Sequence, residues 1–192
     1  MTLFLKRMGM TPFLKWVLVC LLGVIGSHSN ASELSELLKA NDHVLLMRHA
    51  LAPGVGDPAG YQLDNCKSQR NLDVQGRAQA QRIGQWLKSQ GVRDALVFSS
   101  AWCRCKETAE KLGLGTPVHE AALNSFFDDM RQGPQSNVKL QKFIETQLKS
   151  KSSKALILVT HHVNIAEFMG ENVGSGDMVL AKVSPQGRLL SY

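Results

Sequence analysis

Two short apolar segments, each followed by a histidine, place the strongest constraint on how this chain can fold. Residues 44–47 are apolar and run directly into Arg48 and His49, and residues 155–159 lead through one threonine to His161. Apolar runs of this length are typical of strands buried on both faces of a parallel sheet. Ligands of such sheets bind beyond the carboxyl ends of the strands, so we expect the two histidines to meet in one site.

The rest of the chain alternates between patterns typical of strands and of helices. We expect further strands at residues 95–98, 117–120, 178–183 and 189–191, the last two as a closing hairpin. We expect helices at residues 32–41, 73–90, 137–150 and 162–169, and no clear period over 121–136. Ser99-Ser100 is the expected junction between a strand and a further helix that continues to about Leu112. This alternation predicts a three-layer α/β/α sandwich with a mostly parallel central sheet. A glycine- and proline-rich loop at residues 51–71 is long enough to be functional or mobile.

The first 31 residues predict a cleavable secretory signal peptide. Three basic residues precede a short apolar run, residues 16–25, and small residues follow up to Ala31. This order is that of a signal peptide, and the apolar run is shorter than the about 20 residues of a membrane span. Cleavage after Ala31 would leave one domain, residues 32–192, in the periplasm or outside the cell with no stable membrane insertion. An uncleaved N-terminal anchor is the alternative.

The charge of the chain gives little reason to expect a nucleic-acid partner. The formal net charge is +6, and three of the basic residues lie in the predicted signal peptide. The remaining chain is therefore only mildly basic, and it has no basic stripe with interleaved aromatic residues. Single arginines near the predicted site matter more for function than the total charge.

A third strand end adds an arginine to the two histidines. Arg104 follows the predicted strand 95–98 and lies near the start of the next helix, where the N-terminus already favours an anion. Together with Arg48 it could neutralise a phosphate dianion, while His49 and His161 supply a nucleophile and a second donor. The sequence shows no cluster of metal ligands beside them. This combination favours metal-free phosphoryl transfer through a phosphohistidine.

Four sequence blocks around these residues resemble the histidine phosphatase superfamily, whose fold is phosphoglycerate-mutase-like. In chain order they are Arg48-His49-Ala50, Leu72-Asp73-x-x-Gly76-x-x-Gln79-Ala80, Ser99-Ser100-x-x-x-Arg104-x-x-x-Thr108-Ala109 and Val159-Thr160-His161. The resemblance implies that His49 is the nucleophile that becomes phosphorylated. It implies that Arg48, Arg104 and His161 complete the phosphate pocket. The expected activity is that of a metal-independent phosphatase, with no cofactor, that acts on a small phosphomonoester or on phosphohistidine.

Other residues are weaker candidates for the site. Arg70 could contact substrate or simply solvate its loop, and His162 could bind substrate or support its neighbour. The glutamate that donates a proton in phosphoglycerate mutases has no counterpart here, because the corresponding region carries Asn124. A leaving alkoxide needs an acid, so Asp128 or Asp129 is the candidate donor, with a solvated acidic loop as the alternative.

The resemblance leaves the substrate and two other functions open. An exported phosphatase could act on an envelope component such as a lipopolysaccharide core phosphate, or on protein phosphohistidine. A bulky inositol phosphate is not favoured, because the chain lacks the length for a large cap domain. A pseudo-phosphatase that binds phosphate or a phosphoprotein without turnover would keep the same arginines. A phosphoglycerate-type mutase is less favoured, because its substrates are cytosolic.

Three cysteines follow the predicted signal peptide: Cys66, Cys103 and Cys105. An oxidising compartment favours a disulfide, and the odd number leaves at least one thiol. We expect Cys66 to pair with Cys103 or Cys105, because both segments flank the predicted site. Residues two apart on a helix point about 200° away from each other, so only one of these two should face Cys66. Three reduced thiols are the alternative.

Overall fold

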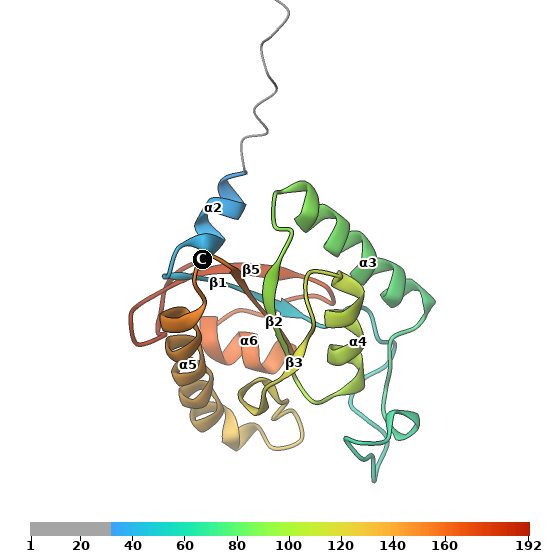
Figure 1. The fold of residues 1–192 in the computed structure, drawn as a ribbon. Helices are drawn as coiled ribbons and strands as arrows, with labels where there is room; N and C mark the ends of the chain where they lie inside the picture. The colour runs from blue at the N-terminus through green and yellow to red at the C-terminus, as the bar shows by residue number, and fades with distance from the viewer. Residues whose placement is uncertain (1–31) are drawn as a thin grey trace, which may run out of the picture. The chain divides into compact units, whose positions relative to one another are not determined.

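The protein, described over residues 32–192 by a computed structural model, is built on one six-stranded sheet (Figure 1). In spatial order the strands are β3 (Val118–His119), β2 (Ala95–Ser99), β4 (Ala155–Thr160), β1 (His43–Arg48), β5 (Met178–Val183) and β6 (Leu189–Ser191). The first four run parallel, and β5 and β6 are antiparallel to their neighbours. The predicted mostly parallel sheet is thereby confirmed.

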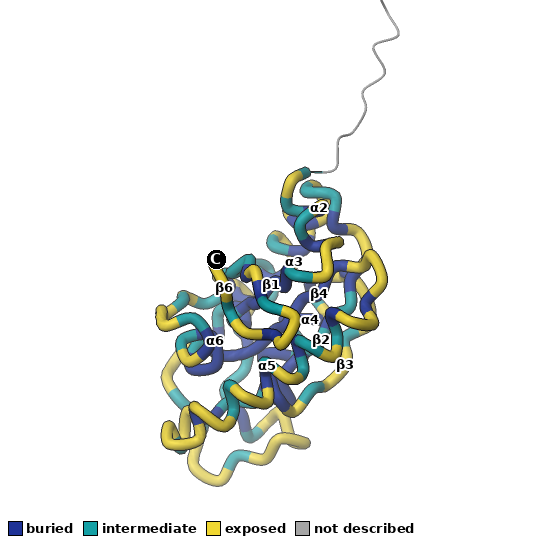
Figure 2. The backbone as a smooth tube through the Cα atoms, turned by 90° about the vertical axis from the view of Figure 1, so that its left-hand side faces the viewer, coloured by how far each residue is buried: buried dark blue, intermediate teal, exposed yellow. Residues whose placement is uncertain are grey.

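Helices cover both faces of the sheet and make the three layers. One face carries α2 (Glu33–Lys39), α3 (Val74–Ser89) and α4 (Cys103–Leu112), and the other carries α5 (Gly133–Ser150) and α6 (His162–Met169). The alternation of side chains along β1 explains why both faces need cover. Leu45 and Met47 join one apolar core cluster, and Val44 and Leu46 join the other. The central strands are accordingly buried along their length (Figure 2).

The helix expected at residues 137–150 begins four residues earlier, at Gly133. Pro134 lies in its first turn, where the missing N–H costs nothing and the fixed φ favours the helix. The first-turn residues carry no apolar stripe, so periodicity alone predicts too late a start. Residues 121–136, which show no clear period, contain two short 3₁₀ turns, η2 (Ala121–Leu123) and η3 (Met130–Gln132).

The long loop after β1 is held against the start of α4. A disulfide joins Cys66 to Cys103, with the two Cα atoms 5.6 Å apart, and so makes one of the two expected pairings. The side-chain oxygen of Gln69 accepts a hydrogen bond from the backbone N–H of Cys103 at 2.9 Å. Cys105, two residues further along the helix, is buried, and its thiol lies 3.6 Å from the carbonyl oxygen of Thr160. The loop is therefore fixed to the helix that carries Arg104.

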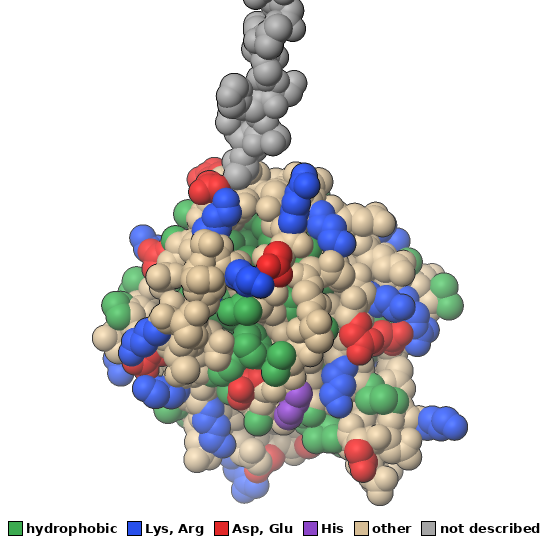
Figure 3. Space-filling model, viewed as in Figure 1, with side chains coloured by type: hydrophobic (Ala, Val, Ile, Leu, Met, Phe, Trp, Pro, Cys, Tyr) green, Lys and Arg blue, Asp and Glu red, His purple; other side chains and the backbone are tan. Residues whose placement is uncertain are grey.

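The surface shows no concentration of one charge on the face seen in Figure 3. Lysine and arginine side chains are scattered there among acidic ones. Within residues 32–192, no helix is both long and apolar enough to cross a membrane. The predicted signal peptide lies outside the described residues.

Candidate active site

The carboxyl ends of β1, β2 and β4 open onto a cavity of about 200 Å³. It brings together Arg48, His49, Arg104 and His161, the four residues that the sequence motifs singled out. Of the weaker candidates, Arg70, Asp128 and His162 also line it, whereas Asp129 does not. Residues that the sequence did not single out complete the wall, among them Asp57, Trp102 and Phe127.

The parallel pairing of β1 with β4 explains why the two histidines meet. Arg48 pairs with Thr160 across the two strands, so the next residue of each strand lies at the same level. The backbone N–H of His49 donates to the carbonyl oxygen of Thr160 at 3.0 Å. The rings of His49 and His161 pack edge to face with their centroids 5.6 Å apart, and both residues are buried.

The hydrogen bonding of His49 leaves one ring nitrogen free to attack a phosphorus atom. Its Nδ1 lies 2.8 Å from the carbonyl oxygen of Ala50, which can only accept, so the proton is on Nδ1 and the lone pair on Nε2. Burial is the main cause that lowers the pKa of His49 to about 3. The Ala50 hydrogen bond opposes this shift, and the positive charges of Arg104, Arg70 and Arg48 add to it. The imidazole is therefore neutral and nucleophilic at physiological pH.

His161 is held by the start of the β2–α4 connection. Its Nε2 lies 2.8 Å from the hydroxyl oxygen of Ser100, and its ring packs against Trp102 with centroids 5.1 Å apart. Burial is the main cause that lowers the pKa of His161 well below its ordinary value, and Arg104 contributes next. The second histidine is thus neutral at physiological pH.

Each of the two arginines that line the cavity has one buried donor without a partner among the described residues. Arg48 donates through Nη1 to the carbonyl oxygen of Val173 at 2.8 Å, and Arg104 donates through Nη1 to Asp57. The Nε atoms of both arginines are buried without a hydrogen-bond acceptor among the described residues. Unsatisfied buried donors are costly and rare. Both arginines line the cavity, so its wall carries two guanidinium groups, which are chemically suited to an anion.

Helix α3 supports the segment that follows His49. At Gly76 it approaches so closely that a Cβ atom would lie 1.9 Å from the carbonyl oxygen of Leu51. The side-chain oxygen of Gln79 accepts from the N–H of Leu51 at 2.8 Å, and the Thr108 hydroxyl accepts from the N–H of Ala50 at 3.0 Å. The glycine, glutamine and threonine of the sequence blocks thus fix the backbone beside His49.

The polar residues of the segment 124–129 make different contacts. Asp128 lies at the cavity and accepts a hydrogen bond from the Tyr61 hydroxyl at 2.9 Å. Asp129 instead pairs with Arg131 at 2.7 Å, and this hydrogen bond lowers its pKa. Asn124 accepts from the backbone N–H of Ala101 at 2.9 Å and so anchors the segment to the start of α4. Among residues 32–192, no three histidine, cysteine, aspartate or glutamate side chains group as metal ligands would.

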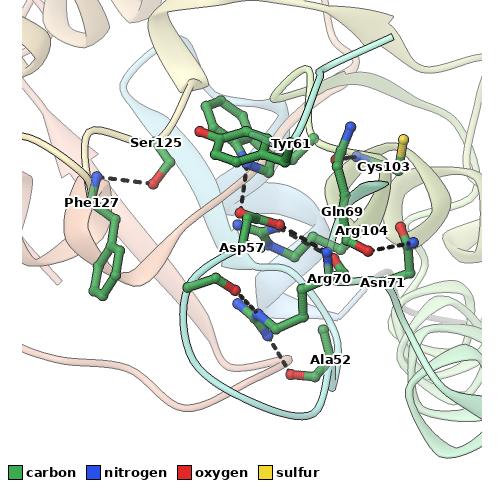
Figure 4. Close-up of polar contacts among 12 residues, drawn as sticks. Ala52, Asp57, Tyr61, Gln69, Arg70, Asn71, Cys103, Arg104, Ser125 and Phe127 are labelled. Carbon is green, nitrogen blue, oxygen red and sulfur yellow. Dashed lines mark hydrogen bonds and ion pairs between the residues drawn. The ribbon is translucent and has the colours of Figure 1, made fainter. Parts of the chain in front are cut away.

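Asp57 is the functional candidate that sequence reasoning missed. Its side chain is 5 % exposed and forms an ion pair with Arg104, whose side chain is 4 % exposed (Figure 4). It also accepts hydrogen bonds from the indole N–H of Trp102 at 3.0 Å and the backbone N–H of Arg70 at 2.9 Å. The available signal was weak, because Asp57 is simply the one acidic residue between His49 and Tyr61.

The neutral buried histidines predict that stability falls when the pH is lowered. The pKa of His49 is about 3 in the folded protein and near its ordinary 6.5 when unfolded, so the unfolded chain binds more protons between these values. The stabilisation is complete above pH 6.5 and is lost as the pH falls, by about 1.4 kcal/mol per pH unit for one histidine. Urea unfolding at pH 7, 6 and 5 measures the slope, to which His161 adds in the same direction.

Two variants test whether His49 causes this dependence of the unfolding free energy on pH. His49→Asn should reduce it by about one histidine's share, because the titrating group is gone while a polar side chain remains. His119→Asn, an exposed change on the edge strand β3, is the matched control. An unchanged slope in His49→Asn would contradict a neutral His49 in the folded protein.

Comparison with known proteins agrees with this geometry. Residues 44–126 match the sequence model of the histidine phosphatase superfamily (branch 1). The fold is similar to a mycobacterial glucosyl-3-phosphoglycerate phosphatase, with a TM-score of 0.57, 14 % identity and coverage of 73 % of this chain and 90 % of that one. It is also similar to the protein histidine phosphatase SixA complexed with tungstate (TM-score 0.54, 20 % identity, coverage 76 % and 91 %). Phosphoserine phosphatase from Entamoeba histolytica in complex with 3-phosphoglyceric acid gives a TM-score of 0.53 at 13 % identity, with coverage of 72 % and 89 %.

No curated protein sequence matches the chain significantly. The solved structures named above are all distant in sequence, so they bear on the fold. The match of residues 44–126 bears on the family, and it includes the arginine–histidine pair and the helix of Arg104. Residues 44–126 thus match the histidine phosphatase superfamily in sequence, and the chain's fold is similar to that of the solved structures named above.

Proposed function

We propose that the protein is a phosphatase that transfers the phosphoryl group of a small phosphorylated substrate to Nε2 of His49 and then to water. The observation that carries the proposal is a neutral, buried His49 in the same cavity as two arginines with unsatisfied Nε donors. An oxyanion between Arg48 and Arg104 would place its phosphorus beside the histidine. The arginines would then stabilise the charge that develops on the phosphoryl oxygens during transfer.

The size of the cavity supports a substrate whose phosphoryl group enters alone. Its volume of about 200 Å³ lies below the roughly 300–1,000 Å³ of pockets that enclose whole small-molecule ligands. The leaving group would then project past Phe127 and His162, which line the cavity with their ring centroids 5.7 Å apart. A sugar phosphate of the cell envelope and a phosphorylated histidine of a protein both present a phosphoryl group in this way.

Export of the protein is part of the proposal. The Cys66–Cys103 disulfide supports it, because disulfides persist in oxidising compartments such as the periplasm. The signal peptide expected over residues 1–31 would direct the chain there.

A substrate panel tests the activity. Purified protein is incubated with aryl, alkyl and sugar phosphates and with a phosphohistidine peptide, with EDTA and no added metal, and inorganic phosphate is measured. We expect phosphate release in the presence of EDTA. Binding of inorganic phosphate without hydrolysis of any substrate would instead favour a phosphate-binding pseudo-phosphatase. Transfer to an added acceptor without phosphate release would favour a mutase.

A further inference from the structure

We propose that a second cavity beside the catalytic one binds the leaving group of the substrate, and that this group has an apolar face and carries no negative charge. The inference rests on the proposed function and names the class of substrate for its site. The second cavity, which we call the side groove, has a volume of about 430 Å³. Phe127 and His162 line both the side groove and the catalytic cavity, so the two adjoin at this pair of rings.

The walls of the side groove are largely apolar. Beyond the shared ring pair they are formed by Met130 of η3 and by Val163 and Ala166 of α6. Phe127 is 39 % exposed and Met130 is 58 % exposed, so both present apolar surface to solvent. Covering such surface is favourable, and a methionine side chain adapts its shape to an irregular partner. A leaving group that passes Phe127 on its way out of the catalytic cavity would cover this surface.

The ring pair at the junction of the two cavities favours a flat or aromatic group. The rings of Phe127 and His162 are inclined by 58° to each other, with their centroids 5.7 Å apart. Figure 4 shows the Phe127 side chain away from the polar cluster around Asp57 and Arg104. An aromatic group that lies against the pair would make stacked or edge-to-face contacts, the arrangements that aromatic rings prefer.

The charges at the side groove disfavour an anionic leaving group. Glu167 of α6 lines the side groove, and Asp128, the neighbour of Phe127 in sequence, lines the catalytic cavity. Both acidic residues are exposed, and among the described residues no lysine or arginine lines the side groove. A carboxylate on the leaving group would therefore be repelled, whereas a neutral or cationic group would not.

Binding of phosphonates tests the side groove without any bond cleavage. A phosphonate presents an oxyanion like that of a phosphomonoester, but its carbon–phosphorus bond is not hydrolysed. We expect benzylphosphonate to bind about tenfold more tightly than methylphosphonate, because its ring covers apolar surface of the side groove. We expect 4-carboxybenzylphosphonate to bind more weakly than benzylphosphonate. Titration calorimetry at pH 7 in the presence of EDTA measures the three dissociation constants.

Two pairs of variants assign these preferences to the side groove. Met130→Ala removes part of the apolar wall and should reduce the preference for benzylphosphonate by about three- to fivefold. Val138→Ala, at a position of α5 that is 64 % exposed and lines neither cavity, should leave the preference unchanged. Glu167→Gln should bring the affinity for 4-carboxybenzylphosphonate closer to that for benzylphosphonate. Glu110→Gln, on α4 across the sheet, should not.

The outcomes distinguish failure of this inference from failure of the proposed function. Equal binding of methylphosphonate and benzylphosphonate would overturn the side groove as a subsite and leave the phosphatase proposal standing, because that proposal depends on the catalytic cavity. A wild-type protein that prefers benzylphosphonate but hydrolyses no substrate of the panel would overturn the proposed hydrolysis and not the subsite.

Two further results would contradict the assignment to the side groove. A preference for benzylphosphonate that survives in full in Met130→Ala would show that the ring binds elsewhere. Analytical ultracentrifugation tests whether a second copy of the chain covers the side groove instead. A dimeric wild-type protein that becomes monomeric in Met130→Ala would overturn the proposal, and a monomeric wild-type protein supports it. Circular dichroism checks that each variant is folded.

Discussion

Replacing His49 by alanine is expected to lower phosphoester hydrolysis by roughly 10⁴–10⁶-fold, the scale of loss seen when an enzyme loses its nucleophile. The reason is that His49 lies in the same cavity as the two arginines with the lone pair of its ring on Nε2. Steady-state rates on 2,4-dinitrophenyl phosphate measure the loss. His119→Ala, on the edge strand β3, is the matched control and should retain the wild-type rate.

The same variant should still bind inorganic phosphate. Arg48 and Arg104 remain in place, and their buried Nε atoms still lack acceptors among the described residues. Titration calorimetry with inorganic phosphate checks this, and circular dichroism checks the fold. Turnover that survives in His49→Ala at more than about one hundredth of the wild-type rate would contradict a covalent role for His49.

Replacing Arg104 by alanine is expected to damage both stability and activity. It leaves the Asp57 carboxylate buried without its cation, and breaking one side of a buried ion pair costs about 3–5 kcal/mol. It also removes one of the two arginine cations that line the cavity, and loss of a donor that stabilises developing charge typically lowers kcat by about 10²–10³-fold. Urea unfolding and hydrolysis of 2,4-dinitrophenyl phosphate measure the two effects.

Two further variants test the cause of the destabilisation. Arg77→Ala breaks a more exposed pair with Glu107 and should destabilise the protein far less than Arg104→Ala. Arg104→Ala combined with Asp57→Asn removes both buried charges and should recover part of the lost stability. A double variant no more stable than Arg104→Ala alone would show that the cost does not come from the unpaired carboxylate.

The residues at the strand ends are the part of the site that sequence could predict. A buried apolar strand has a defined end, and parallel strands end at the same edge of the sheet. The positions of Arg48, His49 and His161 in the sequence therefore predict that they meet, and the motif spacing adds Arg104. The structure places all four in one cavity.

Asp57 could not be predicted in this way. It lies in a loop of glycine and proline residues that has no periodicity, so nothing local shows which side chains turn inward. Its direction is set by Trp102 and Arg104, more than forty positions further along the chain. Contacts of this kind depend on the tertiary fold, and a single sequence does not display them.

The cysteine pairing and the start of α5 could also be predicted only in part from the sequence. Helix geometry indicates that only one of Cys103 and Cys105 can face Cys66, but it does not say which. The packing of α4 decides this, because Cys105 turns toward the end of β4 and Cys103 toward the loop. For α5, the first turn is polar and starts with a glycine, so the helix period becomes visible only further along.

Direct detection of a phosphorylated His49 tests the central claim. The protein is mixed rapidly with ³²P-labelled alkyl phosphate, quenched in alkali during turnover, and digested for mass spectrometry. We predict label on the peptide that contains His49, stable in alkali and lost in acid, and none in His49→Ala. Turnover without label on His49, or label on a different residue, would contradict the account.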